Sequence, residues 1–340
     1  MLKRRCYKVF KPGSLNSLKL REEELAAPAA GQATIAVKAI GLNYADIFAI
    51  MGLYSATPKE AFVPGLEFSG EVVATGAGVS RFKPGDAVFG VSRFGAYTTH
   101  LNLDERYLLP LPTGFTYNDA AAFPVQALTA YYALRPLGNL QQGQTVLIHS
   151  AAGGVGLLAN RIAKKWNAYT IGVVGSSSKF ETLAQEGYNS WLARSSRFPQ
   201  ELERVLAGRP LHLVLEATGG KYLKWSYEAM APMGRLVAYG SARFTPSGSA
   251  PNWPRLAWQY LTRPKIDPMK MITENKSVMG FNLIWLYEQH DLFHQLMQEL
   301  LELQLQPPHI GHYFSFNELP QALQLFRSGN TVGKVVIRVG

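Results

Sequence analysis

The chain has 340 residues, of which 47% are hydrophobic and 17% charged, so it can bury a large core, and its length favours two domains over one. Its only cysteine, Cys6, excludes an intrachain disulfide and a zinc site built from several cysteines, and nothing in the sequence places an activating base beside it. The formal charge of +10 favours an anionic ligand, but the basic residues are scattered, which indicates surface charge rather than a nucleic-acid-binding face.

The first third of the chain predicts a β-rich domain. Residues 1–13 begin with a basic run but lack the apolar stretch of a secretory signal, and no apolar run of membrane-spanning length follows, so we expect a cytoplasmic protein. Between residues 31 and 110, short β-rich segments alternate with turn signals, which is typical of an antiparallel, barrel-like domain. Residues 117–134 have apolar side chains at helical spacing and predict a helix capped by Asn118 or Asp119.

The remainder of the chain predicts an α/β domain. From residue 145 to 241, predicted strands and helices alternate, which indicates βαβ crossovers and a parallel sheet. Residues 243–275, rich in Pro, Arg, Lys and Trp, interrupt this alternation and are expected to form a loop or lid. A last strand is predicted in residues 277–288, followed by an amphipathic helix over 291–304. The β segment at 333–339 would make the first domain discontinuous if it returns there.

A glycine cluster follows the predicted strand at residues 145–150 and opens a helix. Its spacing, Ala151-x-Gly153-x-x-Gly156, fits a dinucleotide-binding turn with alanine in the first glycine position. Without Cβ atoms the backbone can turn sharply, approach a pyrophosphate and pack the helix against the strand. A tight turn without a ligand is the alternative, but the βα units that follow favour a cofactor site. The predicted contacts in the turn are Ala152, Gly153, Gly154, Val155 and Gly156.

The end of the next predicted strand indicates which nucleotide binds. An Asp or Glu there would accept a hydrogen bond from a ribose 2′-OH, but the sequence has Gly175, three serines beginning at Ser176, and Lys179. These donors and this cation favour NADPH over NADH, because they attract a 2′-phosphate and no acid repels it. The alternative is an ordinary solvated helix start.

Four segments together resemble the medium-chain dehydrogenase/reductase superfamily and, within it, the zinc-free quinone oxidoreductases of zeta-crystallin type. They are GLNYADIFAIMGLY (41–54), VPGLEFSGEVV (63–73), HSAAGGVG (149–156) and GKVVI (333–337). A fifth segment, residues 275–288, together with the insertion before it, most resembles the vesicle amine transport protein branch.

This resemblance implies an α/β protein in which a GroES-like, β-rich catalytic domain, formed from both chain ends, encloses a Rossmann domain with a parallel sheet. The boundaries that we predict are residues 1–124 and 305–340 for the catalytic domain and 125–304 for the NADP-binding domain. The resemblance also implies a homodimer.

The sequence predicts chemistry without a metal. Zinc-dependent members of the superfamily have a cysteine and a histidine where this chain has Asn43 and Leu66, and Glu67 alone is not a zinc site. Hydride transfer to a quinone or an α,β-unsaturated carbonyl produces a delocalised enolate or phenolate, which hydrogen-bond donors can stabilise without a Lewis acid. We therefore expect a quinone or enone as the small-molecule substrate.

The resemblance suggests four catalytic residues. Asn43 and Tyr54 are expected to donate hydrogen bonds to the acceptor oxygen, and Tyr54 or solvent to supply the proton. Asp46 is expected to orient its neighbours, because a carboxylate beside a developing oxyanion is unfavourable. Thr129 matches a threonine at the nicotinamide end. The alternatives are a turn asparagine, a packing tyrosine and a core-helix hydroxyl.

Further cofactor contacts are expected from both domains. Lys179 and Arg194 would meet the 2′-phosphate, although Arg194 fits a surface arginine equally well. The remaining candidates are Asn43, Thr129, Gly175, Ser176, Gly240, Ser241, Phe281, Asn282 and, near the phosphates, Lys334. For Phe281, Asn282 and Lys334 the alternative is strand packing or a solvated charge.

Three classes of function are left open by the sequence. The leading one is an NADPH-dependent reductase of quinones or enones. The second is an NADPH-binding protein with little turnover that associates with RNA, and the third is a peripheral membrane protein. The predicted lid would serve as a substrate roof, a membrane-contacting patch or an interdomain surface through Trp253, Trp258, Tyr260, Arg255, Arg263 and Lys265.

Overall fold

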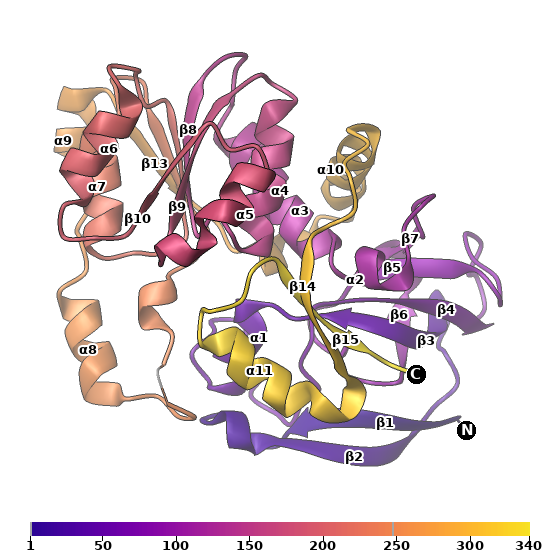
Figure 1. The fold of residues 1–340 in the computed structure, drawn as a ribbon. Helices are drawn as coiled ribbons and strands as arrows, with labels where there is room; N and C mark the ends of the chain where they lie inside the picture. The colour runs from indigo at the N-terminus through magenta and orange to yellow at the C-terminus, as the bar shows by residue number, and fades with distance from the viewer. Residues whose placement is uncertain (1, 247) are drawn as a thin grey trace.

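The computed structural model of the chain describes residues 2–246 and 248–340 and has two lobes, a parallel-sheet lobe and an antiparallel-sheet lobe (Figure 1). The parallel sheet contains β8 (Thr145–His149), β9 (Tyr169–Val174), β10 (Ser190–Ala193), β11 (Leu213–Glu216), β12 (Arg235–Ala238) and β13 (Ser277–Gly280). Its order, β10-β9-β8-β11-β12-β13, is that of a Rossmann fold. Helices cover both faces, so strands such as β8 are buried throughout and appear as uninterrupted apolar runs.

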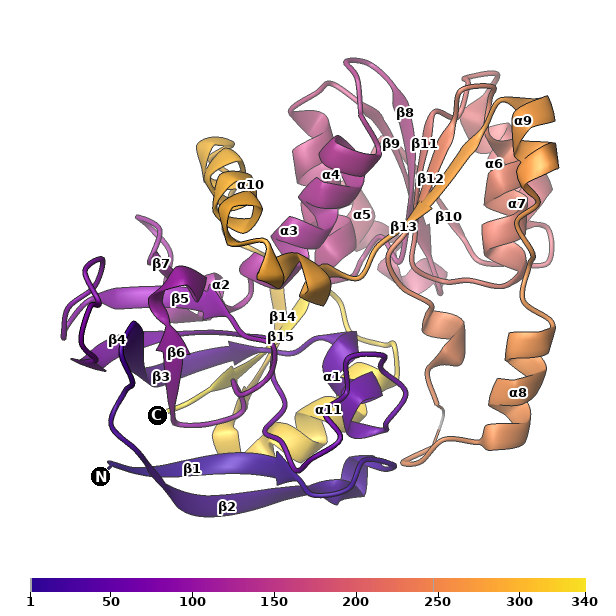
Figure 2. The same cartoon turned by 180° about the vertical axis from the view of Figure 1, so that it is seen from behind.

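The helices divide between the two faces of this sheet, as Figures 1 and 2 both show. One face carries α3 (Pro124–Tyr132), α4 (Gly154–Lys164), α5 (Phe180–Gln185) and α10 (His290–Glu302). The other carries α6 (Phe198–Leu206), α7 (Lys221–Ala229) and α9 (Pro268–Glu274). The separate helix α8 (Trp253–Leu261) projects beside the antiparallel lobe.

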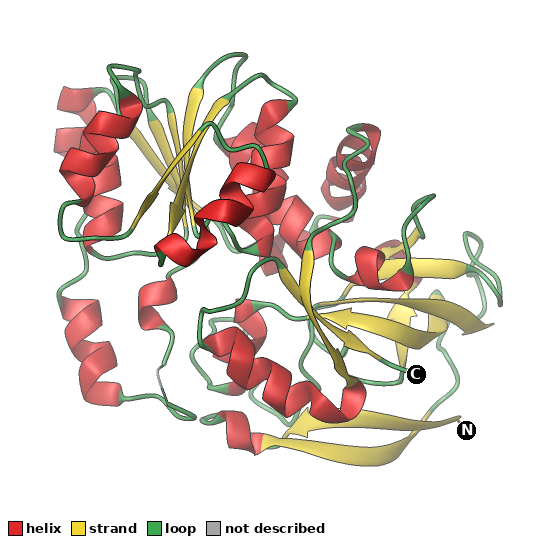
Figure 3. Ribbon diagram, viewed as in Figure 1, coloured by secondary structure: helices red, strands yellow, loops and turns green. Residues whose placement is uncertain are grey.

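The antiparallel lobe is built from both ends of the chain (Figure 3). Its sheet contains β3 (Gln32–Gly41), β4 (Glu67–Thr75), β5 (Ala87–Val91), β6 (His100–Asp104), β7 (Leu108–Pro110), β14 (Ile310–Ser315) and β15 (Lys334–Arg338), beside a hairpin of β1 (Leu2–Val9) and β2 (Leu18–Leu25). Its helices are α1 (Tyr44–Ile50), α2 (Tyr117–Ala121) and α11 (Leu319–Arg327). Strand β15 pairs antiparallel with β3, which confirms that the C-terminal β segment returns to the first domain.

Short helices complete the chain. They are the 3-10 helices η1 (Leu15–Ser17), η2 (Glu105–Tyr107), η4 (Ser177–Lys179), η5 (Ala242–Phe244), η6 (Leu283–Glu288) and η7 (Phe316–Glu318), and the π-helix η3 (Ala133–Leu137). Within the described parts of the chain, no helix combines the length and apolar character needed to cross a membrane.

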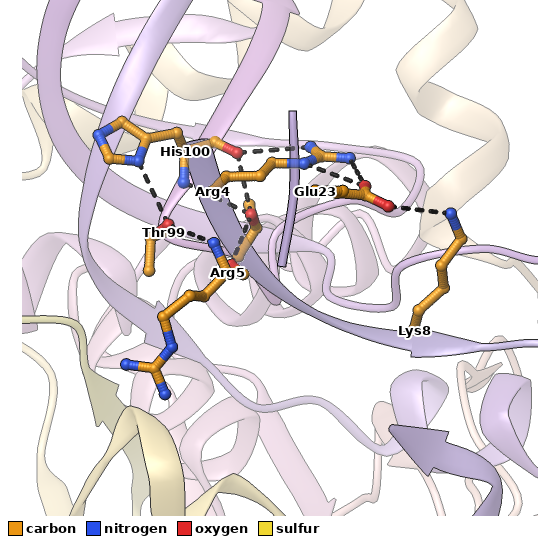
Figure 4. Close-up of polar contacts among 7 residues, drawn as sticks. Arg4, Arg5, Lys8, Glu23, Thr99 and His100 are labelled. Atoms are coloured by element: carbon orange, nitrogen blue, oxygen red, sulfur yellow. Dashed lines mark hydrogen bonds and ion pairs between the residues drawn. The ribbon is translucent and has the colours of Figure 1, made fainter. Parts of the chain in front are cut away.

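The basic run near the N-terminus is engaged within the protein. Arg4 and Lys8 on β1 both bond the carboxylate of Glu23 on β2, and the main-chain N–H of Arg5 donates to Oγ1 of Thr99 at 3.0 Å (Figure 4). The hydrogen bond from Arg4 is the main reason that the pKa of Glu23 is lowered. These pairs reduce the free positive charge on this surface.

Three local predictions need correction. The single helix expected over 117–134 is two helices. Pro124 is the first residue of α3, a position at which the main-chain N–H that proline lacks would have no partner within the helix. The cap of α2 is Thr116, whose side chain forms a reciprocal capping box with Asp119. The last strand ends at Gly280, and residues 283–288 form η6 instead of continuing it.

Candidate active site

A cleft of about 1560 Å³ lies between the two lobes and is lined by residues from both. Among its described lining residues there are three cationic side chains, Lys179, Arg194 and Arg327, and no aspartate or glutamate. Such a wall favours an anionic ligand. Sixteen of the 18 predicted site residues line the cleft; the exceptions are Asp46 and Lys334.

The glycine turn occupies the floor of this cleft between β8 and α4. A Cβ at Gly156 would lie 2.6 Å from the Cα of Ala151, and one at Gly154 would lie 1.9 Å from Oε1 of Gln126. A Cβ at Gly153 has only the carbonyl oxygen of Ser150, at 3.2 Å, within 4 Å. The close approach of the Ala151 main chain therefore demands glycine at 156, a Cβ at 154 would displace the Gln126 amide, and at Gly153 the bare backbone leaves room for a ligand at the N-terminus of α4.

Two cations lie beside the end of β9. A Cβ at Gly175 would be 2.7 Å from Nη2 of Arg194, and Nη1 of the same guanidinium donates to Oγ1 of Thr218 at 3.3 Å. Nζ of Lys179 donates to the main-chain carbonyls of Gly329 and Thr331, each at 2.8 Å. Burial, assisted by the neighbouring Arg194, lowers the pKa of Lys179. The two predicted phosphate-binding side chains are thus close to each other.

A tyrosine–asparagine pair faces the cleft near the end of the parallel sheet. The hydroxyl of Tyr54 donates to Oδ1 of Asn282 at 2.6 Å. Burial is the main cause that raises the pKa of Tyr54 to about 12, so this hydroxyl keeps its proton at neutral pH. Thr129 donates to the carbonyl of Val125 at 2.7 Å, which leaves its oxygen able to accept. The other predicted residues on this wall are Gly240, Ser241 and Phe281.

Asn43 connects the cleft to a buried polar cluster. Its Nδ2 donates to Glu67 at 2.8 Å and to the carbonyl of Gly41 at 3.3 Å, and its Oδ1 accepts from Nζ of Lys334 at 2.9 Å. The amide is fully bonded within the protein, so donation to an acceptor oxygen requires one of these bonds to be exchanged.

Lys334 does not lie at a phosphate site. Its side chain is completely buried and forms an ion pair with Glu67 beneath Asn43, which corrects the expectation that it contacts the cofactor near its phosphates. A β15 side chain directed into the core cannot reach the cleft from there. The ammonium instead fixes the orientation of the Asn43 amide.

Asp46 is also buried behind the cleft wall. Its Oδ2 accepts from the main-chain N–H of Asn43 at 2.8 Å and from the hydroxyl of Tyr97 at 2.9 Å, whereas Oδ1 has no partner. Burial raises the pKa of Asp46 to about 7. Its contacts suit an orienting role.

Gln126 and Arg327 are two of the cleft-lining residues that were not predicted from the sequence. Gln126 is buried on α3, and its Oε1 has no hydrogen-bond partner. Its spacing of one helical turn from Thr129 is a signal that could have identified it. Arg327 donates to the carbonyls of Pro246 at 3.2 Å and Gly248 at 2.7 Å, a long-range contact that has no local sequence signal.

Two family models match the chain: the alcohol dehydrogenase GroES-like domain over residues 29–113 and the zinc-binding dehydrogenase over residues 154–302. The chain is 31% identical over 342 residues to the human synaptic vesicle membrane protein VAT-1 homolog, covering 99% of this chain and 86% of the relative. The chain belongs to the medium-chain dehydrogenase/reductase superfamily. The *Danio rerio* VAT-1 homolog is 32% identical over 310 residues, covering 90% of this chain and 64% of the relative.

Solved structures of this oxidoreductase superfamily have the same fold. The human VAT-1 homolog-like protein has a TM-score of 0.85 at 26% identity, covering 100% of this chain and 99% of that one. The CurK enoyl reductase has a TM-score of 0.84 at 27% identity, covering 99% of each chain. A quinone oxidoreductase of *Pseudomonas syringae* pv. Tomato has a TM-score of 0.82 at 27% identity, covering 98% and 99%.

The description of the second family model as zinc-binding does not extend to the residues of this cleft. Asn43 and Leu66 stand where zinc-dependent members of the superfamily are expected to have their cysteine and histidine ligands. In the described part of the chain, no three His, Cys, Asp or Glu residues are grouped in a way that could hold a metal ion.

Proposed function

We propose that the protein is a zinc-independent, NADPH-dependent reductase of quinones or α,β-unsaturated carbonyl compounds. The observation that carries this proposal is a single cleft that combines the glycine turn, the Lys179–Arg194 pair and the Tyr54–Asn282 pair. The similarity to an enoyl reductase and a quinone oxidoreductase supports the same class of acceptor.

The cleft fits a phosphorylated nicotinamide cofactor. The main-chain N–H groups at the start of α4, beside the bare backbone of Gly153, would bind its pyrophosphate. Lys179 and Arg194 would bind its 2′-phosphate. Thr129 would accept from the nicotinamide amide. When bound, this cofactor supplies the hydride for the reaction.

The protein would contribute orientation and a neutral proton donor. Tyr54 keeps its proton at neutral pH, and a rotation of its hydroxyl away from Asn282 would direct that proton to an acceptor oxygen. The apolar side chains of the wall would limit water around a bound acceptor, which would strengthen this hydrogen bond as negative charge develops on the oxygen. Lys334 and Glu67 hold Asn43 in place beside the reacting groups.

A fluorescence titration of the purified protein with NADPH and NADH, followed by 1,4-benzoquinone, 9,10-phenanthrenequinone and a medium-chain enal, tests the proposal. We expect tighter binding of NADPH and oxidation that depends on the acceptor. Binding without turnover of any acceptor would favour a non-catalytic NADPH-binding protein. A lack of NADPH binding would refute the cofactor assignment.

A second candidate is association with a membrane surface. Trp258, Leu261, Met269 and Ile272 are exposed on α8 and α9, near basic residues such as Lys265. Two relatives, from human and Danio rerio, are named synaptic vesicle membrane proteins. Co-sedimentation with anionic but not zwitterionic vesicles, weakened by salt, would support it.

We also propose that the chain forms a homodimer through β13. This strand ends the parallel sheet and pairs only with β12 among the described strands, so its other edge is available to a second copy. Sedimentation equilibrium should give twice the mass of the chain. Val278→Pro, which removes a main-chain donor from β13, should yield monomer.

A further inference from the structure

Helix α8 presents an apolar stripe to the cleft. Trp253, Leu256, Ala257 and Tyr260 all line it, and their spacing of i, i+3, i+4 and i+7 places them on one face of the helix. In an ordinary surface helix such a stripe packs against the core. Here Trp253 and Tyr260 remain 62% and 57% exposed although the guanidinium of Arg263 lies 3.7 Å from the centre of the Tyr260 ring, so the described chain leaves most of this face uncovered.

Pro246, Gly248 and Ser249, which precede α8, accept hydrogen bonds from the antiparallel lobe. Arg327 at the end of α11 donates to the carbonyls of Pro246 and Gly248. The carbonyl of Ser249 accepts from the main-chain N–H of Leu15 and from the hydroxyl of Ser14, each at 2.9 Å. These bonds cross from one lobe to the other and hold the start of α8 beside the cleft.

The cleft has room for more than its cofactor. Its volume of about 1560 Å³ exceeds the ~300–1000 Å³ that is usual for one ligand. The dinucleotide is polyanionic and matches the cationic wall around Lys179, whereas the α8 stripe offers no charge. The side chains of Phe48, Leu53 and Phe244 add further apolar wall to the same cavity. An extended carbon chain matches this part of the cleft.

We propose that the α8 stripe binds the hydrocarbon tail of the acceptor, so that the preferred substrates are enones or quinones with a long alkyl chain. This inference rests on the proposed function and specifies its substrate class. Trp253 and Leu256 are then specificity-determining residues, because each methylene that they cover leaves water. The substrate carbonyl lies toward Tyr54 and its tail toward α8.

The test uses a homologous series of 2-alkenals from four to ten carbons. We expect kcat/KM to rise by roughly threefold to fourfold for each methylene that the stripe covers. The double variant Trp253→Ala/Leu256→Ala should flatten this rise, so that the ratio of its kcat/KM values for the ten-carbon and four-carbon enals falls toward one. The matched control is Trp258→Ala/Leu261→Ala, which removes the same residue types from α8 at exposed positions outside the cleft.

A binding measurement separates this inference from the proposed function. Saturated methyl ketones from 2-butanone to 2-undecanone, titrated calorimetrically into the protein with NADP⁺, report on tail binding even if no acceptor is reduced. Affinity that rises with chain length, and is weakened by the Trp253/Leu256 variant alone, supports the stripe as the tail site. An equal chain-length dependence in both double variants, or a loss confined to NADPH affinity, would overturn it.

Discussion

The ammonium of Lys334 and the carboxylate of Glu67 form an ion pair in which neither side chain is exposed to solvent. Burial lowers the pKa of Lys334, and the adjacent Glu67 opposes that effect. Because the same two groups bond both ends of the Asn43 amide, they connect the stability of the antiparallel lobe to the geometry of the cleft.

Removing one partner of this pair should destabilise the fold. Lys334→Met leaves the Glu67 carboxylate buried without a counter-charge, and we expect a loss of about 3–5 kcal/mol in the free energy of unfolding. The double variant Lys334→Met/Glu67→Gln should recover part of that loss, because no charge is then left unpaired. Urea denaturation measures both, and a double variant less stable than the single one would contradict this account.

Substitutions in the glycine turn should separate folding from cofactor binding. Gly156→Ala brings a Cβ to 2.6 Å from the main chain of Ala151, so its thermal midpoint should fall. The Cβ of Gly153→Ala would meet only the carbonyl oxygen of Ser150, at 3.2 Å, so this variant should lose less stability than Gly156→Ala but bind NADPH at least about tenfold more weakly. Thermal melts measure the stability of both variants, and fluorescence titrations measure their affinity for NADPH. Unchanged NADPH affinity in Gly153→Ala would count against a pyrophosphate at the turn.

The two cations at the end of β9 should determine the preference for NADPH. Each charge-assisted hydrogen bond to the 2′-phosphate contributes about 1.5–3 kcal/mol, so Lys179→Ala/Arg194→Ala should reduce NADPH affinity by roughly 100-fold or more. Affinity for NADH should change little. Lys224→Ala, a lysine on α7 outside the cleft, is the control. An equal loss for both nucleotides would show that the pair does not read the 2′-phosphate.

Tyr54→Phe should lower kcat while leaving NADPH binding intact. The variant keeps the ring but removes the hydroxyl that donates to Asn282 at 2.6 Å, and we expect a decrease of about 100-fold if this hydroxyl supplies the proton. Steady-state rates with a quinone and an enal, beside NADPH dissociation constants, provide the comparison. A normal kcat would assign the proton to solvent.

Asp46 should make stability depend on pH. Its pKa is raised by burial to about 7 in the folded chain, above the 3.8 of an ordinary aspartate, so between these values the folded state binds more protons. The resulting stabilisation is complete below pH 3.8 and is lost as the pH rises through about 7. Relative to Asp46→Asn, the native protein should lose about 2 kcal/mol between pH 5 and 8. Urea denaturation at several pH values measures this, and a constant difference between the two proteins would refute it.

Features encoded in consecutive residues were predictable from the sequence. The β8–α4 turn combines an apolar strand, glycines and a helix within 20 residues, and the strands of the parallel sheet appear as apolar runs because both faces are buried. The break at Pro124 had a local signal, but the apolar spacing on both sides obscured it.

Features that depend on tertiary contacts were not predictable. The role of Lys334 depends on Asn43 and Glu67, and the tether of Arg327 depends on carbonyls that precede α8. From its residue type, Lys334 was expected to be a surface charge or a phosphate ligand. Only the path of the chain shows that it is buried beside Glu67 instead.

The return of β15 to β3 has a consequence for synthesis on the ribosome. Asn43 and Lys334 are 291 residues apart in sequence, so at about 5–20 residues per second the β3 edge waits roughly 15–60 s for its final partner. During that interval the edge of residues 39–41 that pairs with β15 has no partner, although Ala39 and Ile40 can already pair with β4 on the other side, and Glu67 lacks the Lys334 ammonium. The nascent antiparallel lobe therefore exposes an open strand edge, which a chaperone could shield, even though the parallel-sheet lobe can complete its sheet first.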